Sequence, residues 1–150
     1  MRSFFVLLSL LLVFPMVFGC SSMRANSARQ NYIHRATEAY VHKRSIETVF
    51  PEARKILFEY GYQVRDSDGN TLETEWATDG QTERRYLVTA TKVNAGYRVN
   101  FTRSEQRESG STSTNRDLDF EWLLIQRLDP NYAAEVSKEA DLRAQAAANN

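Results

Sequence analysis

The residue with the most distinctive chemistry in this sequence is Cys20, the one cysteine of the chain. It follows Gly19 at the end of an apolar run, residues 4–18, and precedes two serines. A thiol can form a disulfide, bind a metal or act as a nucleophile. The chain offers Cys20 no second cysteine, no metal-binding companions and no catalytic base. Covalent modification of the thiol is therefore the chemistry for which Cys20 is placed.

The residues before Cys20 have the form of an export signal. Arg2 supplies a positive charge, and residues 4–18 are apolar apart from one serine. This run is shorter than the ~20 residues that span a bilayer, and it fits the apolar region of a secretory signal. The sequence therefore predicts a signal peptide over residues 1–19.

The junction Val17-Phe18-Gly19-Cys20 resembles the lipobox of bacterial lipoproteins. The resemblance implies cleavage after Gly19, a thioether from Cys20 to diacylglycerol, and acylation of the amine that cleavage frees. Each buried methylene contributes ~0.8 kcal/mol, so two or three chains would anchor the protein permanently. Ser21 stands where an inner-membrane retention signal would place Asp, which implies the outer membrane and its periplasmic face. The alternatives are a cleaved signal with a coincidental cysteine and an uncleaved anchor.

A group of alternating side chains suggests calcium. Asp66, Asp68 and Asn70 have the spacing of a calcium-binding loop, which would also need Gly at position 71 and Glu at position 77. The sequence has Thr71 and Ala77 at these positions. We therefore expect a turn and no calcium site.

The remaining candidates for catalysis or metal binding are isolated. Glu73 and Glu75 share one side of a predicted strand, but nothing apolar surrounds them to raise a pKa, so we expect a solvated charged face. The two histidines, His34 and His42, have no ligand or triad partners at a suitable spacing. No nucleophile elbow or phosphate-binding loop is present. We expect no enzyme activity, no cofactor and no metal site.

Length and charge limit the class of protein. Removal of residues 1–19 takes Arg2 with it and leaves 131 residues, with 18 basic and 19 acidic side chains. This balance argues against a nucleic-acid binder and against an acidic disordered tail. We expect four segments: a signal peptide (1–19), a lipidated polar linker (20–36), a single α+β domain (37–143) and a frayed C-terminal tail (144–150).

The clearest predicted element is a helix that begins after Ser45 and ends before Gly61. Its apolar residues recur on one helical face: Val49, Ala53, Ile56, Leu57 and Tyr60. Ser45 is the expected N-cap, Pro51 should lie near the first turn, and Gly61 should follow the C-cap. Before this helix, residues 37–44 suggest a first strand.

Alternating apolar residues then predict two hairpins. In residues 62–76 a two-residue Asp68-Gly69 loop would place the apolar sets on opposite faces. A three-residue loop that ends at a left-handed Asn70 instead pairs Tyr62 with Trp76, Val64 with Thr74 and Arg65 with Glu73. The second hairpin turns near residues 94–96, with a loop of two or four residues. It pairs Val88 with Phe101 and Ala90 with Val99.

The rest of the chain predicts a loop and two helices. The second strand of that hairpin should continue to about Glu105, and a free loop should fill the rest of residues 102–116. Residues 117–128 form a broad apolar helical stripe. Asp129 and Pro130 are the N-cap and first residue of a last helix, which should fray after about Arg143. The sequence thus predicts an α+β two-layer sandwich in which a sheet of four to five antiparallel strands packs against a long helix.

The stretches "FPEARKILFEYGYQV", "DSDGNTLETEW" and "RRYLVTATKV", followed by a late helix with a tryptophan, resemble one repeat of BamC-type lipoproteins. BamC is a subunit of the machinery that assembles outer-membrane β-barrels. The resemblance covers residues 37–128 and implies a helix-grip fold, in which a curved sheet holds a long helix. BamC has two such domains and a long N-terminal segment that contacts a partner, whereas this chain has one domain and a short linker.

Aromatic residues suggest where the domain could bind. Eight of them should face inward, as core or as the wall of a cleft between helix and sheet: Tyr60, Tyr62, Trp76, Tyr86, Tyr97, Phe101, Phe120 and Trp122. We expect a non-enzymatic outer-membrane lipoprotein that binds an envelope protein through its polar sheet face and edge strand, as an accessory of envelope or barrel assembly. The alternative is a carrier of a small apolar ligand in the cleft.

Overall fold

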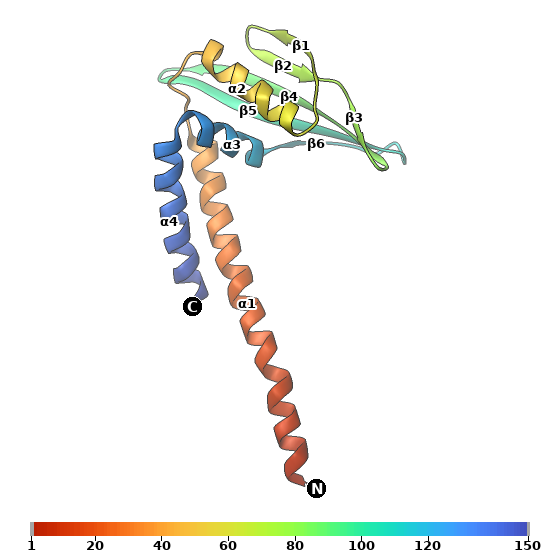
Figure 1. The fold of residues 1–150 in the computed structure, drawn as a ribbon, viewed down its shortest axis with the longest axis vertical. Helices are drawn as coiled ribbons and strands as arrows, with labels where there is room; N and C mark the ends of the chain where they lie inside the picture. The colour runs from red at the N-terminus through yellow and green to blue at the C-terminus, as the bar shows by residue number, and fades with distance from the viewer. Residues whose placement is uncertain (1, 150) are drawn as a thin grey trace. The chain divides into compact units, whose positions relative to one another are not determined.

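The computed structural model describes residues 2–149, with side chains from residue 21 onward other than Asp79. The chain divides into two compact units, residues 36–133 and residues 1–35 with 134–150. The elements, in chain order, are α1 (Arg2–Ala39), α2 (Ile46–Glu59), β1 (Val64–Asp68), β2 (Thr71–Thr74), β3 (Ala77–Asp79), β4 (Thr82–Val93), β5 (Gly96–Arg107), β6 (Thr112–Arg116), α3 (Leu118–Leu128) and α4 (Pro130–Ala148) (Figure 1).

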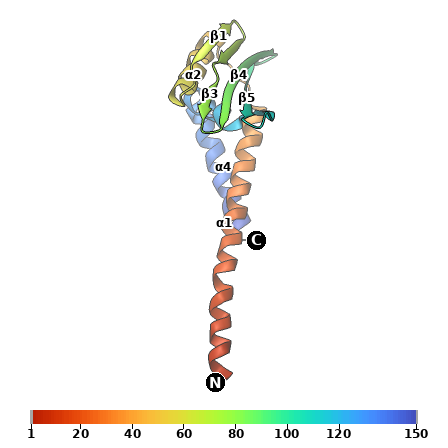
Figure 2. The same ribbon diagram turned by 90° about the vertical axis from the view of Figure 1, so that its right-hand side faces the viewer.

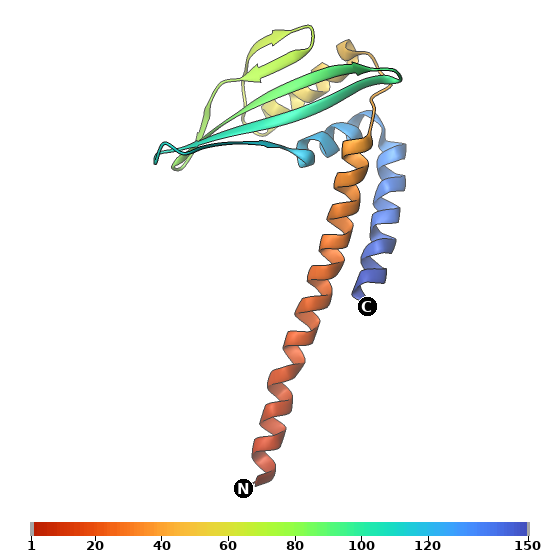
Figure 3. The same cartoon turned by 180° about the vertical axis from the view of Figure 1, so that it is seen from behind.

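One unit contains the greater part of α1 and of α4, which lie side by side in opposite directions (Figures 1 and 3). Arg29 Nε donates to Asp141 Oδ1 at 2.8 Å. The Arg143 guanidinium lies 4.4 Å from the centre of the Tyr32 ring. These contacts tie the second half of α1 to the last turns of α4.

The polar linker expected over residues 20–36 is helical instead, because α1 continues to Ala39. The segment contains no glycine or proline, and Ala, Arg and Gln give it a fair helix propensity. No helix of the described residues is both long enough and apolar enough to cross a membrane. The predicted signal peptide and the Cys20 thiol lie outside the described side chains.

The strand expected over residues 37–44 does not form. After α1 ends, His42 makes a single antiparallel bridge with Tyr97. His42 N donates to Tyr97 O at 2.8 Å, and Tyr97 N donates to His42 O at 2.9 Å. The two backbone segments come closest at Gly96, where a Cβ would lie 2.1 Å from the His42 carbonyl oxygen. Residues 37–44 therefore contribute one close backbone contact to the sheet and not a strand.

The helix predicted after Ser45 is present as α2. Val49, Ala53, Ile56 and Leu57 are fully buried, whereas Tyr60, at the C-cap, is 55% exposed. Ser45 occupies the N-cap position without a capping hydrogen bond from its side chain. Pro51 lies inside the helix, beyond the first turn where it was expected.

The end of α2 is a Schellman motif, as the position of Gly61 predicted. Gly61 N donates to Phe58 O at 3.0 Å, and Tyr62 N donates to Leu57 O at 2.8 Å. Gly61 has a φ of 85°, a conformation that a side chain disfavours. The motif turns the chain directly from the helix into the first hairpin.

The first hairpin keeps one predicted pair, Val64 with Thr74, but its loop differs. Asp68 pairs with Thr71, so Gly69-Asn70 is a two-residue loop and the predicted three-residue loop is wrong. A β-bulge between Val64 and Asp66 shifts the register and returns Val64 to its predicted partner. The prediction failed because it assumed a regular ladder.

The bulge also changes the neighbours in this hairpin. The Cα partner of Glu73 is Asp66, yet the Arg65 side chain still reaches Glu73 at 2.9 Å. Asn70 is not left-handed, since no described residue other than glycine has a positive φ. Asp68 Oδ1 instead accepts from Asn70 N at 2.9 Å and Thr71 N at 2.8 Å, which stabilises the turn.

The second hairpin confirms the predicted register of β4 and β5. Val88 pairs with Phe101 and Ala90 with Val99, around a two-residue loop. The free loop expected within residues 102–116 is wrong, because β5 runs to Arg107 and β6 then pairs with it. The strand β6 is polar on both faces, and it therefore carries no apolar alternation to reveal it.

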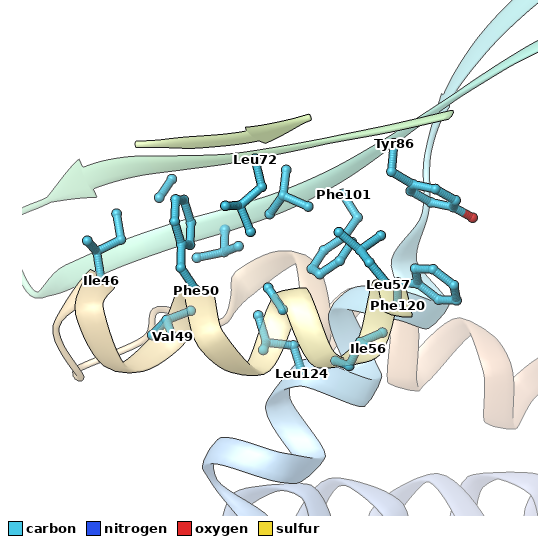
Figure 4. Close-up of a cluster of buried hydrophobic side chains, with 14 of the residues drawn as sticks. Ile46, Val49, Phe50, Ile56, Leu57, Leu72, Tyr86, Phe101, Phe120 and Leu124 are labelled. Atoms are coloured by element: carbon cyan, nitrogen blue, oxygen red, sulfur yellow. The ribbon is translucent and has the colours of Figure 1, made fainter. Parts of the chain in front are cut away.

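The sheet has six strands. Five follow the order β1-β2-β4-β5-β6, and β3 pairs with the first residues of β4, Thr82 to Arg84. Its curvature is visible in Figure 2. Helices α2 and α3 pack on one face, where apolar side chains from both layers meet (Figure 4). Figure 3 shows the opposite face, which carries no helix of this unit. The predicted α+β class, with a curved antiparallel sheet against a helix, is confirmed.

The two C-terminal helices begin where the sequence predicted. Asp117 caps α3 by accepting from Phe120 N, and Asp129 caps α4 by accepting from Tyr132 N. The helix α4 starts at Pro130 and continues to Ala148, past the expected fraying point. The α+β unit itself ends at residue 133, within α4.

Candidate binding cleft

A cleft of about 650 Å³ lies at one end of the α+β unit, between the end of α2, the start of α3 and the strands β3, β4 and β5. Its lining combines aromatic, charged and small residues: Tyr60, Gly61, Tyr62, Ala77, Thr78, Arg84, Tyr86, Arg103, Asp117, Asp119, Phe120 and Leu123. This volume falls within the range of small-ligand sites.

Four rings form one wall of the cleft. Phe120 stacks on Tyr86 with ring centres 4.9 Å apart, and Tyr60 lies 4.7 Å from Phe120. Tyr62 meets Tyr86 edge to face at 4.7 Å. Tyr86 and Phe120 are buried in the core (Figure 4), whereas Tyr60 remains 55% exposed. A planar or apolar group that entered the cleft would find this wall already ordered.

Asp117 organises the polar wall. Tyr86 Oη donates to Asp117 Oδ2 at 2.7 Å, and Arg103 Nη1 approaches the same oxygen at 3.4 Å. The other oxygen, Oδ1, accepts from Phe120 N at 3.1 Å. Burial, and then the hydrogen bond to Asp117, raise the pKa of the Tyr86 hydroxyl far above its usual value. The Asp117 carboxylate is thus occupied in holding α3 against β4 and β5.

Arg103 has donors that the fold does not use. Arg84 Nε donates to Glu105 Oε1 at 3.0 Å, and Arg103 Nε lies 3.1 Å from the same oxygen. The second contact is an ion pair without a hydrogen bond, since the buried Arg103 Nε makes none. Because Nε is buried, it is the Nη groups of Arg103, a residue that lines the cleft, that can meet an acceptor there.

The cleft combines an apolar wall with hydrogen-bonding groups. Among the described side chains, no three His, Cys, Asp or Glu residues are grouped to hold a metal ion. The aromatic wall supplies apolar contact, and Arg103 supplies hydrogen-bond donors at one side. This combination suits a ligand with an apolar or planar body and a polar acceptor.

No family model, no curated protein and no solved structure matches this chain.

The acidic candidates of the sequence stand apart from the cleft. Asp68 closes the turn, and hydrogen bonds, first from the Asn70 backbone, lower the pKa of its carboxyl. Glu73 accepts from Arg65 and from Arg85 at 2.9 and 2.7 Å, as expected for a charged face. Glu75 is exposed just after β2. None of these three carboxylates lines the cleft.

The histidines are also separate. His34 lies on α1, where its Nε2 is 2.8 Å from Gln30 Nε2. His42 is buried, packs edge to face on Tyr40, and bridges to Tyr97 through its backbone. Burial lowers the pKa of His42 to about 4.

The aromatic prediction is partly correct. Tyr86, Phe101 and Phe120 are buried, and three more of the eight are partly so: Tyr62, Tyr97 and Trp122. Trp76 is 38% exposed, and the Arg85 guanidinium lies 4.8 Å from its ring centre. The expected cleft is therefore lined by tyrosines and Phe120, and neither tryptophan takes part.

Sequence reasoning missed the ion pair between the buried Glu121 and Arg116. Glu121 is 3% exposed, and its two oxygens accept from Arg116 Nε at 2.8 Å and Nη2 at 2.6 Å. A signal was present, because Glu121 has the helical spacing of the buried Leu124, Ile125 and Leu128. A carboxylate within an apolar stripe indicates a buried partner.

Proposed function

We propose that this protein is a non-enzymatic lipoprotein of the bacterial outer membrane, anchored through acylated Cys20 and exposed to the periplasm. Its α+β unit would serve as a binding module for another envelope protein. The observation that carries the proposal is the one-sided sheet: α2 and α3 cover one face, no helix of the unit covers the other, and the outer edges of β1 and β6 have no strand beside them within the unit. The lipobox-like junction before Cys20 supports the anchor.

The uncovered sheet face has the composition of a contact surface. Trp76 and Leu87 are 38% and 39% exposed, and Arg85 lies over the Trp76 ring. Arg85 also donates to Glu73 at 2.7 Å, which holds its guanidinium in place. Aromatic and arginine side chains of this kind dominate binding at protein interfaces. We therefore assign the partner contact to this face.

The resemblance of residues 37–128 to BamC-type repeats supports a place in envelope or β-barrel assembly. The test is native purification after mild crosslinking. The proposal predicts that one envelope protein copurifies with the wild type and is lost with Trp76→Ala combined with Leu87→Ala. Phe58→Ala, at a site 72% exposed on α2, is the matched control and should keep the partner. Loss with the control alone, or recovery of the protein without any partner, would contradict the proposal.

The second candidate function, a small-ligand carrier, is supported by the cleft beside α2 and α3. Because Arg103 and Asp117 line it, the ligand would need a polar acceptor in addition to an apolar body. Mass spectrometry of the natively purified protein would show a bound small molecule in the wild type and less of it in Tyr60→Ala. An empty protein would remove this candidate.

A further inference from the structure

The two border strands of the sheet differ in how they are protected. Both β1 and β6 have a neighbouring strand on one side alone. Border strands present unpaired backbone N–H and C=O groups, and proteins block these edges with charges or bulges. The strand β1 has both kinds of protection, since it is bulged next to Val64 and carries Arg65, Asp66 and Asp68.

The strand β6 has neither protection over most of its length. Its five residues are all exposed, and they pair with β5 in an unbroken register from Thr112 to Arg116. Arg116 is the one charged residue of β6, and its guanidinium is held by Glu121. The edge of β6 is therefore regular and uncharged except at its end.

The hydrogen bonds around β6 show which backbone groups point away from the sheet. Arg107 N donates to Ser111 O at 3.0 Å, and Asp117 N donates to Phe101 O at 2.7 Å. Because antiparallel pairing alternates, the odd-numbered residues between these bonds direct their backbone groups to β5. Thr112, Thr114 and Arg116 consequently direct theirs outward.

We propose that β6 pairs antiparallel with β6 of a second copy of this chain, centred on Thr114. In that register Thr114 faces Thr114, and Arg116 of each copy faces Thr112 of the other. The outward N–H and C=O groups of all these residues are then satisfied, and no two arginines are opposed. Facing threonines are favourable cross-strand neighbours, and the two-fold arrangement closes as a dimer.

The pairing goes beyond the proposed partner contact and does not depend on the lipid anchor. One strand from each copy makes a small interface, so the dimer should be weak in dilute solution. Two copies held on the same surface would pair more readily, because their effective concentration is higher. The pairing would leave the Trp76 face of each copy open.

The test is disulfide formation in the full chain with Cys20→Ser as background, so that an introduced cysteine is the one thiol present. Thr114→Cys should link readily, since facing residues in such a ladder are ~5.5 Å apart between Cα atoms, within the disulfide range. Thr112→Cys is the matched control, because its copies would be four residues out of register, ~13 Å apart. We expect the disulfide to form at least ~10-fold faster with cysteine at position 114, where the Cα atoms are close, than at position 112.

A second variant separates loss of pairing from loss of folding. Thr114→Lys keeps the backbone donors but opposes two like charges, and sedimentation at high protein concentration should then show a monomer with unchanged circular dichroism. Equal linking at positions 112 and 114, or a wild type that stays monomeric at every concentration, would overturn the proposal. Linking of position 114 to a different protein in cells would also overturn it, and would assign β6 to a foreign strand.

Discussion

The carboxylate of Glu121, on α3, accepts the backbone N–H of Phe101, on β5, at 3.0 Å. This N–H group lies opposite the junction of β6 and α3, where Asp117 N donates a hydrogen bond to the Phe101 carbonyl oxygen. Phe101 is fully buried, so its N–H would otherwise have no partner. Glu121 thus replaces the missing strand and joins the helical layer to the sheet.

Removal of this carboxylate should destabilise the α+β unit strongly. Glu121→Ala leaves the Phe101 N–H without a partner and Arg116 without its counter-ion, and we expect a loss of about 3 kcal/mol in the free energy of unfolding. Glu121→Gln keeps an acceptor oxygen and should lose less. Urea denaturation measures both. The control is Glu59→Ala, which removes an exposed ion pair with Arg127 and should leave the midpoint nearly unchanged. Equal effects at positions 59 and 121 would contradict this role.

The close approach of His42 to Gly96 should make the stability of the α+β unit sensitive to a side chain at position 96. A Cβ at position 96 would lie 2.1 Å from the His42 carbonyl oxygen, and Gly96 has a φ of 150°. Gly96→Ala should therefore separate the two segments, break the bridge from His42 to Tyr97, and lower stability by about 2–3 kcal/mol. Thermal unfolding should show a reduced midpoint. Gly69 lies at a turn with open space around it, so Gly69→Ala should leave the midpoint nearly unchanged. An equal fall in midpoint for Gly69→Ala and Gly96→Ala would show that the close contact is not the cause.

Stability should fall in mild acid because of His42. Burial lowers the pKa of its imidazole to about 4, from about 6.5 in the unfolded chain. Between these values the unfolded state binds a proton that the folded state does not, so stability is full above about pH 6.5 and declines toward pH 4. The nearby Asp129 carboxylate opposes the shift but is the weaker effect. The loss attributable to His42 approaches ~3 kcal/mol.

The measurement is urea denaturation at several values between about pH 7 and about pH 4.5. The free energy of unfolding of His42→Gln should depend less steeply on pH than that of the wild type, since the substitution removes the group that protonates on unfolding. His34→Gln, on α1, is the matched control and should keep the wild-type slope. Identical slopes for His42→Gln and the wild type would show that other groups govern the acid response.

Where an apolar pattern decided the register, the sequence was sufficient. Val88 and Phe101 could be paired correctly because the turn near residues 94–96 leaves few registers, and the shared apolar face excludes those shifted by one residue. The caps at Asp129 and Gly61 were equally readable, because each position demands a particular residue type. These features are local, and they define most of the core layer.

What the sequence did not reveal depends on contacts distant along the chain. The strand β6 is polar on both faces and owes its place to pairing with β5. The second half of α1 was expected to be a linker because its stripe is mostly small residues, Ala25, Ala28 and Ala36, with Tyr32 and Ile33 as the larger members. Ile33 is 3% exposed, so the helix has a packed side that the sequence pattern showed only weakly. The cleft could be predicted as a gap between layers, but its polar wall depends on Asp117, which the sequence showed only as the first residue of a predicted helix.

The most direct test of the account is the mass of the N-terminal peptide of protein recovered from the membrane fraction. The account predicts a peptide that begins at Cys20 and carries a diacylglycerol thioether and an N-linked acyl chain. Cys20→Ser should not yield this peptide and should leave the outer-membrane fraction after a salt wash. A peptide with a free Cys20 thiol, or a Cys20→Ser protein that stays with the outer membrane after that wash, would contradict the account.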